Sequence, residues 1–194
     1  DPTRQYSRNR TDGSNGDGNG AFLHWNAEQF PIPFYVSRDA LMGHQNFANA
    51  IHESFRPWRD IEGVRVEFID LGCSENVRNA NDGLNNVIFV TDAWPFDATN
   101  VAITRNFYIA DGTEKAGLIL DSDILINAVG FSFTTTNEPG KYDLQNTLTH
   151  EVGHFLGLGH ETNPVSTEGT MFATTVSNET IKRTLSANDI QGIF

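Results

Sequence analysis

The sequence predicts an α+β fold, a single domain with about five strands, two long helices and a C-terminal helix. The first observation is the order of local patterns, which runs strand, helix, several strands, helix, loop, helix without an internal repeat. The second is size and composition, since 194 residues, 38% of them hydrophobic and 14 of them Phe, suffice for one packed core. We expect residues 1–20 to form a flexible N-terminal arm and residues 21–194 to form the domain.

The arm contains the stretch TDGSNGDGNG at residues 11–20, which consists almost entirely of turn formers and offers little to bury. Some of its side chains resemble part of a calcium loop: Asp12, Asn15, Asp17 and Asn19. Their spacing differs from the EF-hand pattern, and the closing Glu is missing. The pattern therefore favours a solvated loop over a calcium site.

The first strand and helix follow the arm. FPIPFYV at residues 30–36 reads as a strand whose prolines are typical of an edge or a strand entry. Ser37 is then expected to cap a helix that ends before Pro57. Three apolar residues of this helix fall on one face: Phe47, Ile51 and Phe55. The alternation in VRVEFID at residues 64–70 predicts the next strand.

Three further strands are expected in the middle of the chain. NNVIFV at residues 85–90 is a short continuous apolar run, as in a buried strand. VAITRNFYI at residues 101–109 and GLILDSDILIN at residues 117–127 are the other two, joined by a turn at residues 110–115.

Two helices complete the pattern. Asp143 can cap a helix over residues 144–156, LQNTLTHEVGHFL, which Gly157 stops. Residues 185–194 read as a closing helix capped by Ser186.

Charge and composition exclude several functional classes. The net charge of −12 and the pI of about 4.7 argue against nucleic-acid binding and against docking on anionic membranes. No apolar run is long enough for a transmembrane segment. Cys73 is the single cysteine, so no intrachain disulfide can form. The chain starts without Met or an apolar leader, and we expect any signal peptide or pro-segment to lie outside it. We also expect a monomer.

Three of the six histidines crowd into LTHEVGHFLGLGHE at residues 148–161. On a helix His150 and His154 lie one turn apart on the same face, where two imidazoles can bind one metal ion. Glu151 points in a neighbouring direction and can reach a water molecule on that metal without being a ligand itself.

His160 lies six residues beyond His154, too far round a continuous helix to meet the other two rings. Gly157 resolves this, because glycine can take a left-handed conformation and turn the chain back. The stretch from 150 to 160 thus reads His-Glu-x-x-His-x-x-Gly-x-x-His with every fixed position filled.

Zinc is the metal that this pattern predicts. Three neutral imidazoles leave the fourth position to water, which is the arrangement of a catalytic site. Glu151 would take a proton from that water and hand it to the leaving amine, so that a peptide bond is hydrolysed. An amphipathic helix with chance histidines is the alternative, but the eleven-residue form is more demanding than His-Glu-x-x-His alone. A zinc site without catalysis would leave Glu151 without a task.

The histidine string resembles the signature of the metzincin metalloproteases. That family carries a methionine in a tight turn beneath the metal. Met171, in EGTMFATT eleven residues after His160, is the candidate for this Met-turn, while Met42 falls in the first predicted helix. The alternative for Met171 is ordinary core packing.

Within the metzincins the chain is most similar to the matrixins. The closing TLSANDIQGIF resembles their C-terminal helix pattern Leu-Ser-x-Asp-Asp-Ile-x-Gly-Ile, and the likeness spans about residues 28–194. The matching residues are Leu185, Ser186, Asp189, Ile190, Gly192 and Ile193. The resemblance implies a twisted mixed sheet and an active-site cleft between an upper part up to about residue 160 and a lower part at 161–194.

The resemblance also implies a function: a secreted zinc-dependent endopeptidase acting on extended protein or peptide substrates. His150, His154 and His160 would hold one catalytic zinc ion, with Glu151 as general base. Two alternatives stay open, a narrowly specific metalloprotease toxin or processing enzyme, and a catalytically silent zinc-binding module.

Some residues depart from the family pattern. Asn188 replaces the first Asp of a pair that can bind a freed N-terminus in matrixins. Glu161 stands where matrixins usually carry Ser, and Ala173 stands where they carry Pro. An extra tyrosine ligand, as in astacins, is missing at Ala173.

Other expectations concern additional metals and the thiol. No histidine lies between His52 and His150, so we expect no structural zinc of the mammalian matrixin type. Calcium on the carboxylates of residues 111–123 is left open. Cys73 lacks the Pro-Arg-Cys-Gly context of a matrixin cysteine switch, which favours a plain thiol.

An extended substrate is expected to pair with an edge strand at residues 101–109 or its continuation to Gly117. Ala116 and Gly117 either let a substrate backbone approach or only complete the turn before the next strand. The side chain after the scissile bond would enter a pocket between the zinc helix and residues 172–180.

Overall fold

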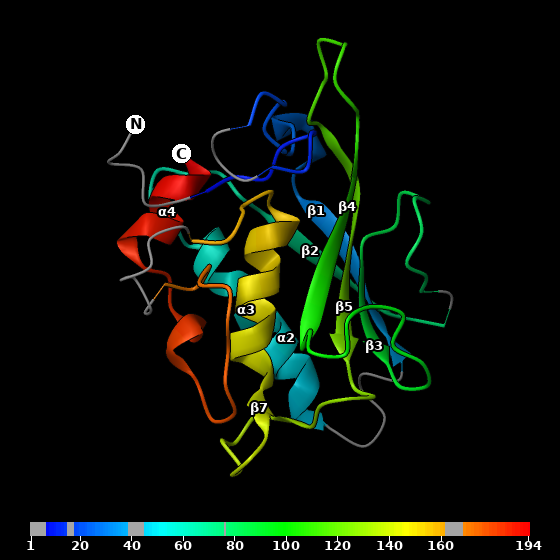
Figure 1. Ribbon diagram of the computed structural model, residues 1–194, viewed down its shortest axis with the longest axis vertical. Helices are drawn as coiled ribbons and strands as arrows, with labels where there is room; N and C mark the ends of the chain where they lie inside the picture. Colours follow the sequence, from blue (N-terminus) through cyan, green and yellow to red (C-terminus); the bar gives the residue numbers. More distant parts are fainter. Residues whose placement is uncertain (1–6, 15–17, 39–44, 76, 162–168) are drawn as a thin grey trace.

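The computed structural model describes residues 7–14, 18–38, 45–75, 77–161 and 169–194. Its main element is a five-stranded sheet in the order β2-β1-β3-β5-β4 (Figure 1). The strands are β1 Ile32–Ser37, β2 Phe68–Ser74, β3 Asn86–Val90, β4 Ala102–Tyr108 and β5 Ile119–Asn127. All neighbouring strands are parallel except β4, which pairs antiparallel with β5 at the edge. The predicted mixed sheet of an α+β fold is confirmed.

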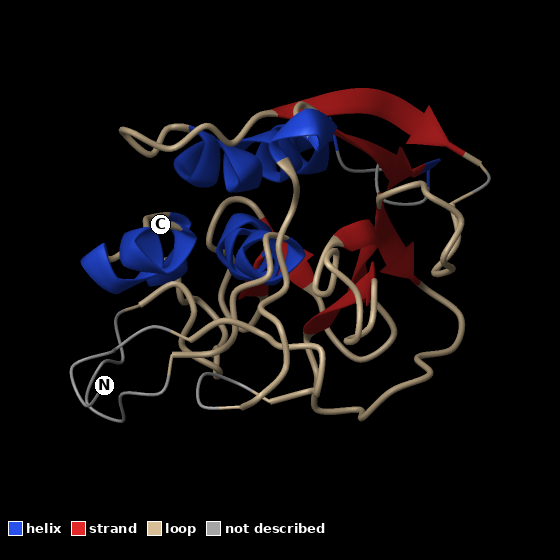
Figure 2. Ribbon diagram, turned by 90° about the horizontal axis from the view of Figure 1, so that it is seen from above, coloured by secondary structure: helices blue, strands red, loops and turns tan. Residues whose placement is uncertain are grey.

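In the described part of the chain three α-helices accompany this sheet, and in Figures 1 and 2 they lie toward one side of the molecule while the strands lie toward the other. The helical elements are α2 Gln45–Arg59, α3 Leu144–Phe155, α4 Ala187–Ile193 and the short 3-10 turns η1 Ala27–Gln29 and η2 Ile181–Arg183. A small two-stranded sheet joins β6 Phe133–Thr134 to β7 Tyr142–Asp143. Among the described residues no helix has both the length and the apolar character that a membrane crossing requires.

The core lies between α2, α3 and one face of the sheet. Alternate residues of the central strands face the helices and are almost fully buried: Ile32, Phe34 and Val36 of β1, and Ile124 and Ile126 of β5. Trp58 of α2 is fully buried, and its Nε1 donates to the carbonyl oxygen of Thr149 at 2.9 Å. This bond joins α2 to the middle of α3 and fixes the position of the histidine-bearing turns.

The boundaries of α3 follow the predicted signals. Asp143 is the N-cap, and its Oδ1 accepts a hydrogen bond from Asn146 N at 2.8 Å. Gly157 has φ +94°, and a Cβ there would lie 2.5 Å from the carbonyl oxygen of Leu23. Both the left-handed backbone and the close approach require glycine. Ser186 caps α4, also as predicted.

The first half of the fold differs from the prediction in three places. Helix α2 continues through Pro57 to Arg59, because the buried Trp58 holds its last turn in place. Strand β1 lies between β2 and β3 rather than at an edge. Its Pro33 precedes the residues that pair with β3, so the missing N–H breaks no bond of that ladder. Strand β2 begins at Phe68, later than the alternation suggested.

The described part of the N-terminal arm is hydrogen-bonded to the rest of the domain at residues 7–9. Asn9 N donates to Gly157 O at 2.9 Å, and Gly159 N donates to Ser7 O at 2.9 Å. Residues 7–9 thus run alongside the turn after α3. The calcium-like positions at Asn15 and Asp17 lie outside the described residues.

The proposed start of the first helix is tested only in part. Ser37 is the last residue of β1, and its Oγ accepts a hydrogen bond from Phe89 N at 3.1 Å. Residues 39–44, which include Met42, lie outside the described part of the chain.

Candidate metal centre

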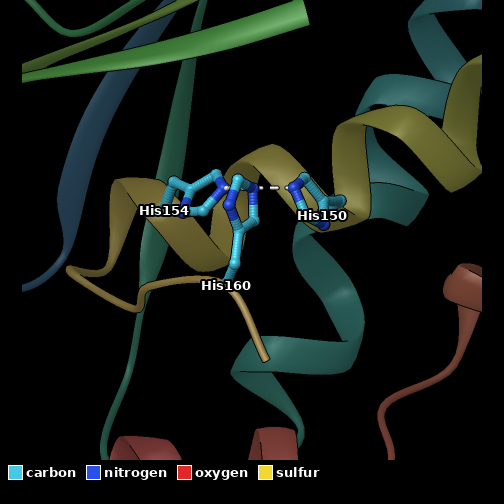
Figure 3. A group of neighbouring side chains, drawn as sticks. All are labelled: His150, His154 and His160. Carbon is cyan, nitrogen blue, oxygen red and sulfur yellow. Dashed lines mark hydrogen bonds between the residues drawn. The ribbon is translucent and has the colours of Figure 1, made fainter. Parts of the chain in front are cut away.

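The three histidines of the 150–160 stretch converge on one point. Helix α3 carries His150 and His154, and the turn at Gly157 brings His160 back toward them (Figure 3). The Nε2 atom of His154 lies 3.1 Å from Nε2 of His150 and 3.1 Å from Nε2 of His160. Among the described residues they are the one group of three His, Cys, Asp or Glu side chains placed to hold a metal ion.

The other ring nitrogens fix which atoms face the centre. His150 Nδ1 lies 2.7 Å from Thr170 O, and His154 Nδ1 lies 2.8 Å from Leu158 O. A carbonyl oxygen can only accept, so each Nδ1 carries the hydrogen and each Nε2 keeps a lone pair. Two nitrogens bound tetrahedrally to one zinc ion at 2.0–2.1 Å would lie roughly 3.3 Å apart. The observed separations fit such an ion.

Burial keeps these rings neutral. Desolvation, with His160 next in effect, lowers the pKa of His154 to about 3. Desolvation and then the neighbouring His154 hold the pKa of His150 well below its usual value, and desolvation also lowers the pKa of His160. All three rings are therefore unprotonated near neutral pH, which is the form that binds metals.

Glu151 lies beside the three rings and is 4% exposed. Thr104 of β4 donates its hydroxyl to Glu151 Oε2 at 2.6 Å. Desolvation raises the pKa of Glu151 to about 7, against the opposing effect of the Thr104 bond. The neighbouring Asn106 donates to the carbonyl oxygen of His154 at 2.8 Å, so β4 and α3 are joined at two points along the cleft.

Met171 packs beneath the histidines, 3% exposed. A Cβ at Gly153 of α3 would lie 2.2 Å from its Sδ, which shows how closely the turn approaches the helix. Asp189 of α4 holds the turn, because its carboxylate accepts the N–H groups of Thr170 at 2.9 Å and Met171 at 3.0 Å. The turn therefore supports the helix face that carries His150 and His154.

A cleft with a volume of about 690 Å3 opens over the three histidines and Glu151. One wall is formed by residues 99–104, which lead into the edge strand β4, and the other is the segment 173–175 after Met171. The expected substrate strand at residues 101–109 and the expected pocket segment at 172–180 overlap these walls. The sequence offered no indication of Thr104 as the partner of Glu151 or of the buried Lys182 in the lining. A β-branched residue in a strand and a lysine in a short polar segment give no local signal of such positions.

Other predicted positions lie elsewhere. Gly117 has φ +85° and bonds to Ile109 and His24, so it completes the turn before β5 and does not line the cleft. Cys73 is exposed on β2, at the opposite edge of the sheet from β4.

The carboxylates of residues 111–123 do not gather in one place. Asp111 is exposed and accepts a hydrogen bond from Ala21 N, whereas Asp121 and Asp123 are buried in β5.

Comparison with known proteins agrees with this arrangement. A family model described as Matrixin matches residues 24–194. Metalloendoproteinase 1 from Glycine max is 26% identical over 173 residues, which cover 87% of this chain and 51% of that protein. The chain thus spans about half the length of the curated relative that it matches.

Proposed function

Because this chain belongs to the matrixin family, we propose that it is a zinc-dependent endopeptidase that cleaves extended protein and peptide substrates. The observation that carries this proposal is the convergence of three neutral imidazoles beside a buried carboxylate at the floor of an open cleft. The alternative of a catalytically silent zinc-binding module leaves the position of Glu151 unexplained.

His150, His154 and His160 would hold the zinc ion through their Nε2 atoms, with their Nδ1 bonds fixing two of the rings. Three protein ligands leave one position of a tetrahedral site to water or substrate. When bound, the zinc ion supplies Lewis-acid polarisation of the scissile carbonyl and makes water more acidic.

Glu151 would act as the general base. Its Oε2 is oriented by Thr104, and its raised pKa suits a group that takes up and releases a proton near neutral pH. The carboxylate would accept a proton from the attacking water while the new C–O bond forms. It would then deliver that proton to the amine nitrogen as the C–N bond breaks.

The substrate backbone would lie along β4, the edge strand of the sheet that borders the cleft. Pairing with an exposed edge strand is a common way to bind an extended peptide. The side chain after the scissile bond would then enter the space between α3 and the segment 173–175.

We also propose that the enzyme acts outside the cell, which is supported by the family resemblance, and that calcium binds at Asp121 and Asp123. The calcium proposal is supported by Asp121 Oδ1, a buried oxygen without a partner among the described residues.

The test of the peptidase is cleavage of casein and of labelled peptides by the wild type, by Glu151→Gln and by chelated protein, with zinc content measured in parallel. We expect one zinc per chain, and we expect Glu151→Gln to keep that zinc but lose at least about a hundredfold in kcat/KM. Glu161→Gln is the matched control, because Glu161 also adjoins a ligand but points to Asn188. It should retain near-normal activity.

Two results would contradict this function. Undiminished cleavage by Glu151→Gln would show that Glu151 is not the general base. A wild type that binds one zinc ion but cleaves none of the substrates would favour the zinc-binding module.

A further inference from the structure

Lys182 is a buried cation in the wall of the cleft. It belongs to η2, and 1% of its surface is exposed. Lysine is seldom buried to this degree unless it is paired. Its backbone N–H donates to Asn146 Oδ1 at 2.8 Å, which fixes η2 against α3 one turn before His150.

The ammonium group is held by main-chain oxygens. Nζ donates to the carbonyl oxygens of Phe172 and of Thr174, the second at 2.8 Å. An ammonium group has three donors, so one N–H is left after these two bonds. Thr174 and Lys182 both line the cleft, and Phe172 directly precedes the lining segment 173–175.

Among the described residues Lys182 forms no contact ion pair. Desolvation lowers its pKa, and the carboxylates of Glu179, Glu151 and Asp189 oppose that shift only in part, without touching the ammonium group. The contrast with the next residue is direct, because Arg183 forms a paired contact with the buried carboxylate of Asp143. A buried charge without an opposite partner is costly, and a carboxylate that arrives with a ligand would offset that cost.

The position of the ammonium group within the cleft decides which part of a ligand would meet it. The neighbouring lining residues are Thr147 of α3 and the segment 173–175, which flank the space on the side of His150. These side chains are largely polar, unlike the apolar lining that a large hydrophobic side chain would need. In the proposed peptidase this space receives the side chain that follows the scissile bond.

We propose that Lys182 makes the enzyme selective for substrates with a carboxylate side chain, Glu or Asp, immediately after the scissile bond. This inference rests on the proposed function for the identity of the ligand as a peptide. The protein's net charge of −12 does not oppose it at short range, because salt screens distant charges within about 10 Å.

The test uses peptides that differ only in the residue after the scissile bond, which is Glu, Gln or Leu. For the wild type we expect kcat/KM to be at least about tenfold higher with Glu than with the isosteric Gln. Lys182→Met keeps the length of the side chain and removes the charge, so the ratio should fall to about one. Lys115→Met, the same change at an exposed lysine, should leave the ratio unchanged.

A binding measurement separates this inference from the peptidase function. Calorimetric titration of zinc-loaded Glu151→Gln protein with the same peptides should give a Kd for the Glu peptide at least about tenfold lower than for Gln. If the protein prefers to bind the Glu peptide but the wild type cleaves none of the peptides, the proposed peptidase function is wrong and the selectivity of the pocket still holds. If proteins with intact Lys182 cleave and bind the Gln or Leu peptide as well as or better than the Glu peptide, the proposed selectivity is wrong. This outcome does not depend on whether Lys182→Met folds.

Discussion

Gly153 lies on the face of α3 between two of the converging histidines, where a side chain has no room. A Cβ there would meet Met171 Sδ at 2.2 Å and Trp58 Cζ2 at 2.9 Å. Replacing a helical glycine with alanine usually stabilises a protein by up to about 1 kcal/mol. Here we expect Gly153→Ala to destabilise it by about 1–3 kcal/mol, because the indole and thioether must move. Denaturant unfolding of the metal-free protein measures the difference.

The cause can be separated from a general defect of the variant. Removing the Met171 side chain frees part of the space, so Gly153→Ala should cost less in a Met171→Ala background than in the wild type. A gain in stability from Gly153→Ala alone would show that the Met171 turn does not press on α3.

At the scale of elements, the structure attaches the Met171 turn to α4 through one carboxylate. Asp189 accepts hydrogen bonds from Thr170 N and Met171 N and also from Ser186 N at 2.7 Å. An amide has a single acceptor oxygen, so Asp189→Asn leaves at least one buried N–H unpaired. We expect a loss of about 1–3 kcal/mol in unfolding free energy and weaker zinc binding, measured by chelator competition.

The matched control for this change is Asp92→Asn, an exposed aspartate whose hydrogen bond within the described residues comes from the N–H of Ala93. It should leave both stability and zinc affinity at the wild-type level. If Asp189→Asn behaved in the same way, α4 would not be what supports the turn.

Elements whose limits are set by local signals could be predicted from the sequence. Asp143 and Gly157 bound α3, and the spacing of the histidines then follows from helix geometry. The continuation of α2 past Pro57 could not be predicted, because it depends on the contact of Trp58 with α3. The metal-binding residues could be predicted because they lie close together in the sequence, on one helix and the turn that follows it. Thr104 and Lys182 were not, because their burial arises from packing between distant segments.

At the scale of the whole molecule, the pH dependence of stability should reflect carboxylates buried away from the cleft. Asp123 lies in β5, where its oxygens accept bonds from Asn86 Nδ2 at 2.8 Å and Ala80 N at 3.1 Å. Desolvation raises the pKa of Asp123 to about 7 from an ordinary value of 3.8. The loop that covers this face of the sheet therefore encloses a carboxyl group that the folded state prefers to keep protonated.

The sign of the effect follows from proton binding. Between about pH 4 and pH 7 the folded protein holds a proton on Asp123 that the unfolded chain has released. The contribution of Asp123 to the unfolding free energy is therefore fully present below its pKa in the unfolded chain. It is lost as the pH rises to 7, by at most about 1.4 kcal/mol per unit of pKa shift. In metal-free protein, Asp123→Asn should flatten the fall in melting temperature over this range.

The same melting experiment with added calcium tests whether these carboxylates bind the ion. An ion bound at Asp121 and Asp123 would favour their ionised forms, so calcium should raise the wild-type melting temperature at pH 7.5 more than at pH 5. Asp123→Asn should respond less at both values. If calcium does not change the wild-type melting temperature but the pH dependence of that temperature is altered in Asp123→Asn, then the fold buries a carboxylic acid here and binds no cation. An unchanged slope in Asp123→Asn would mean that the ionised carboxylate costs the folded state nothing.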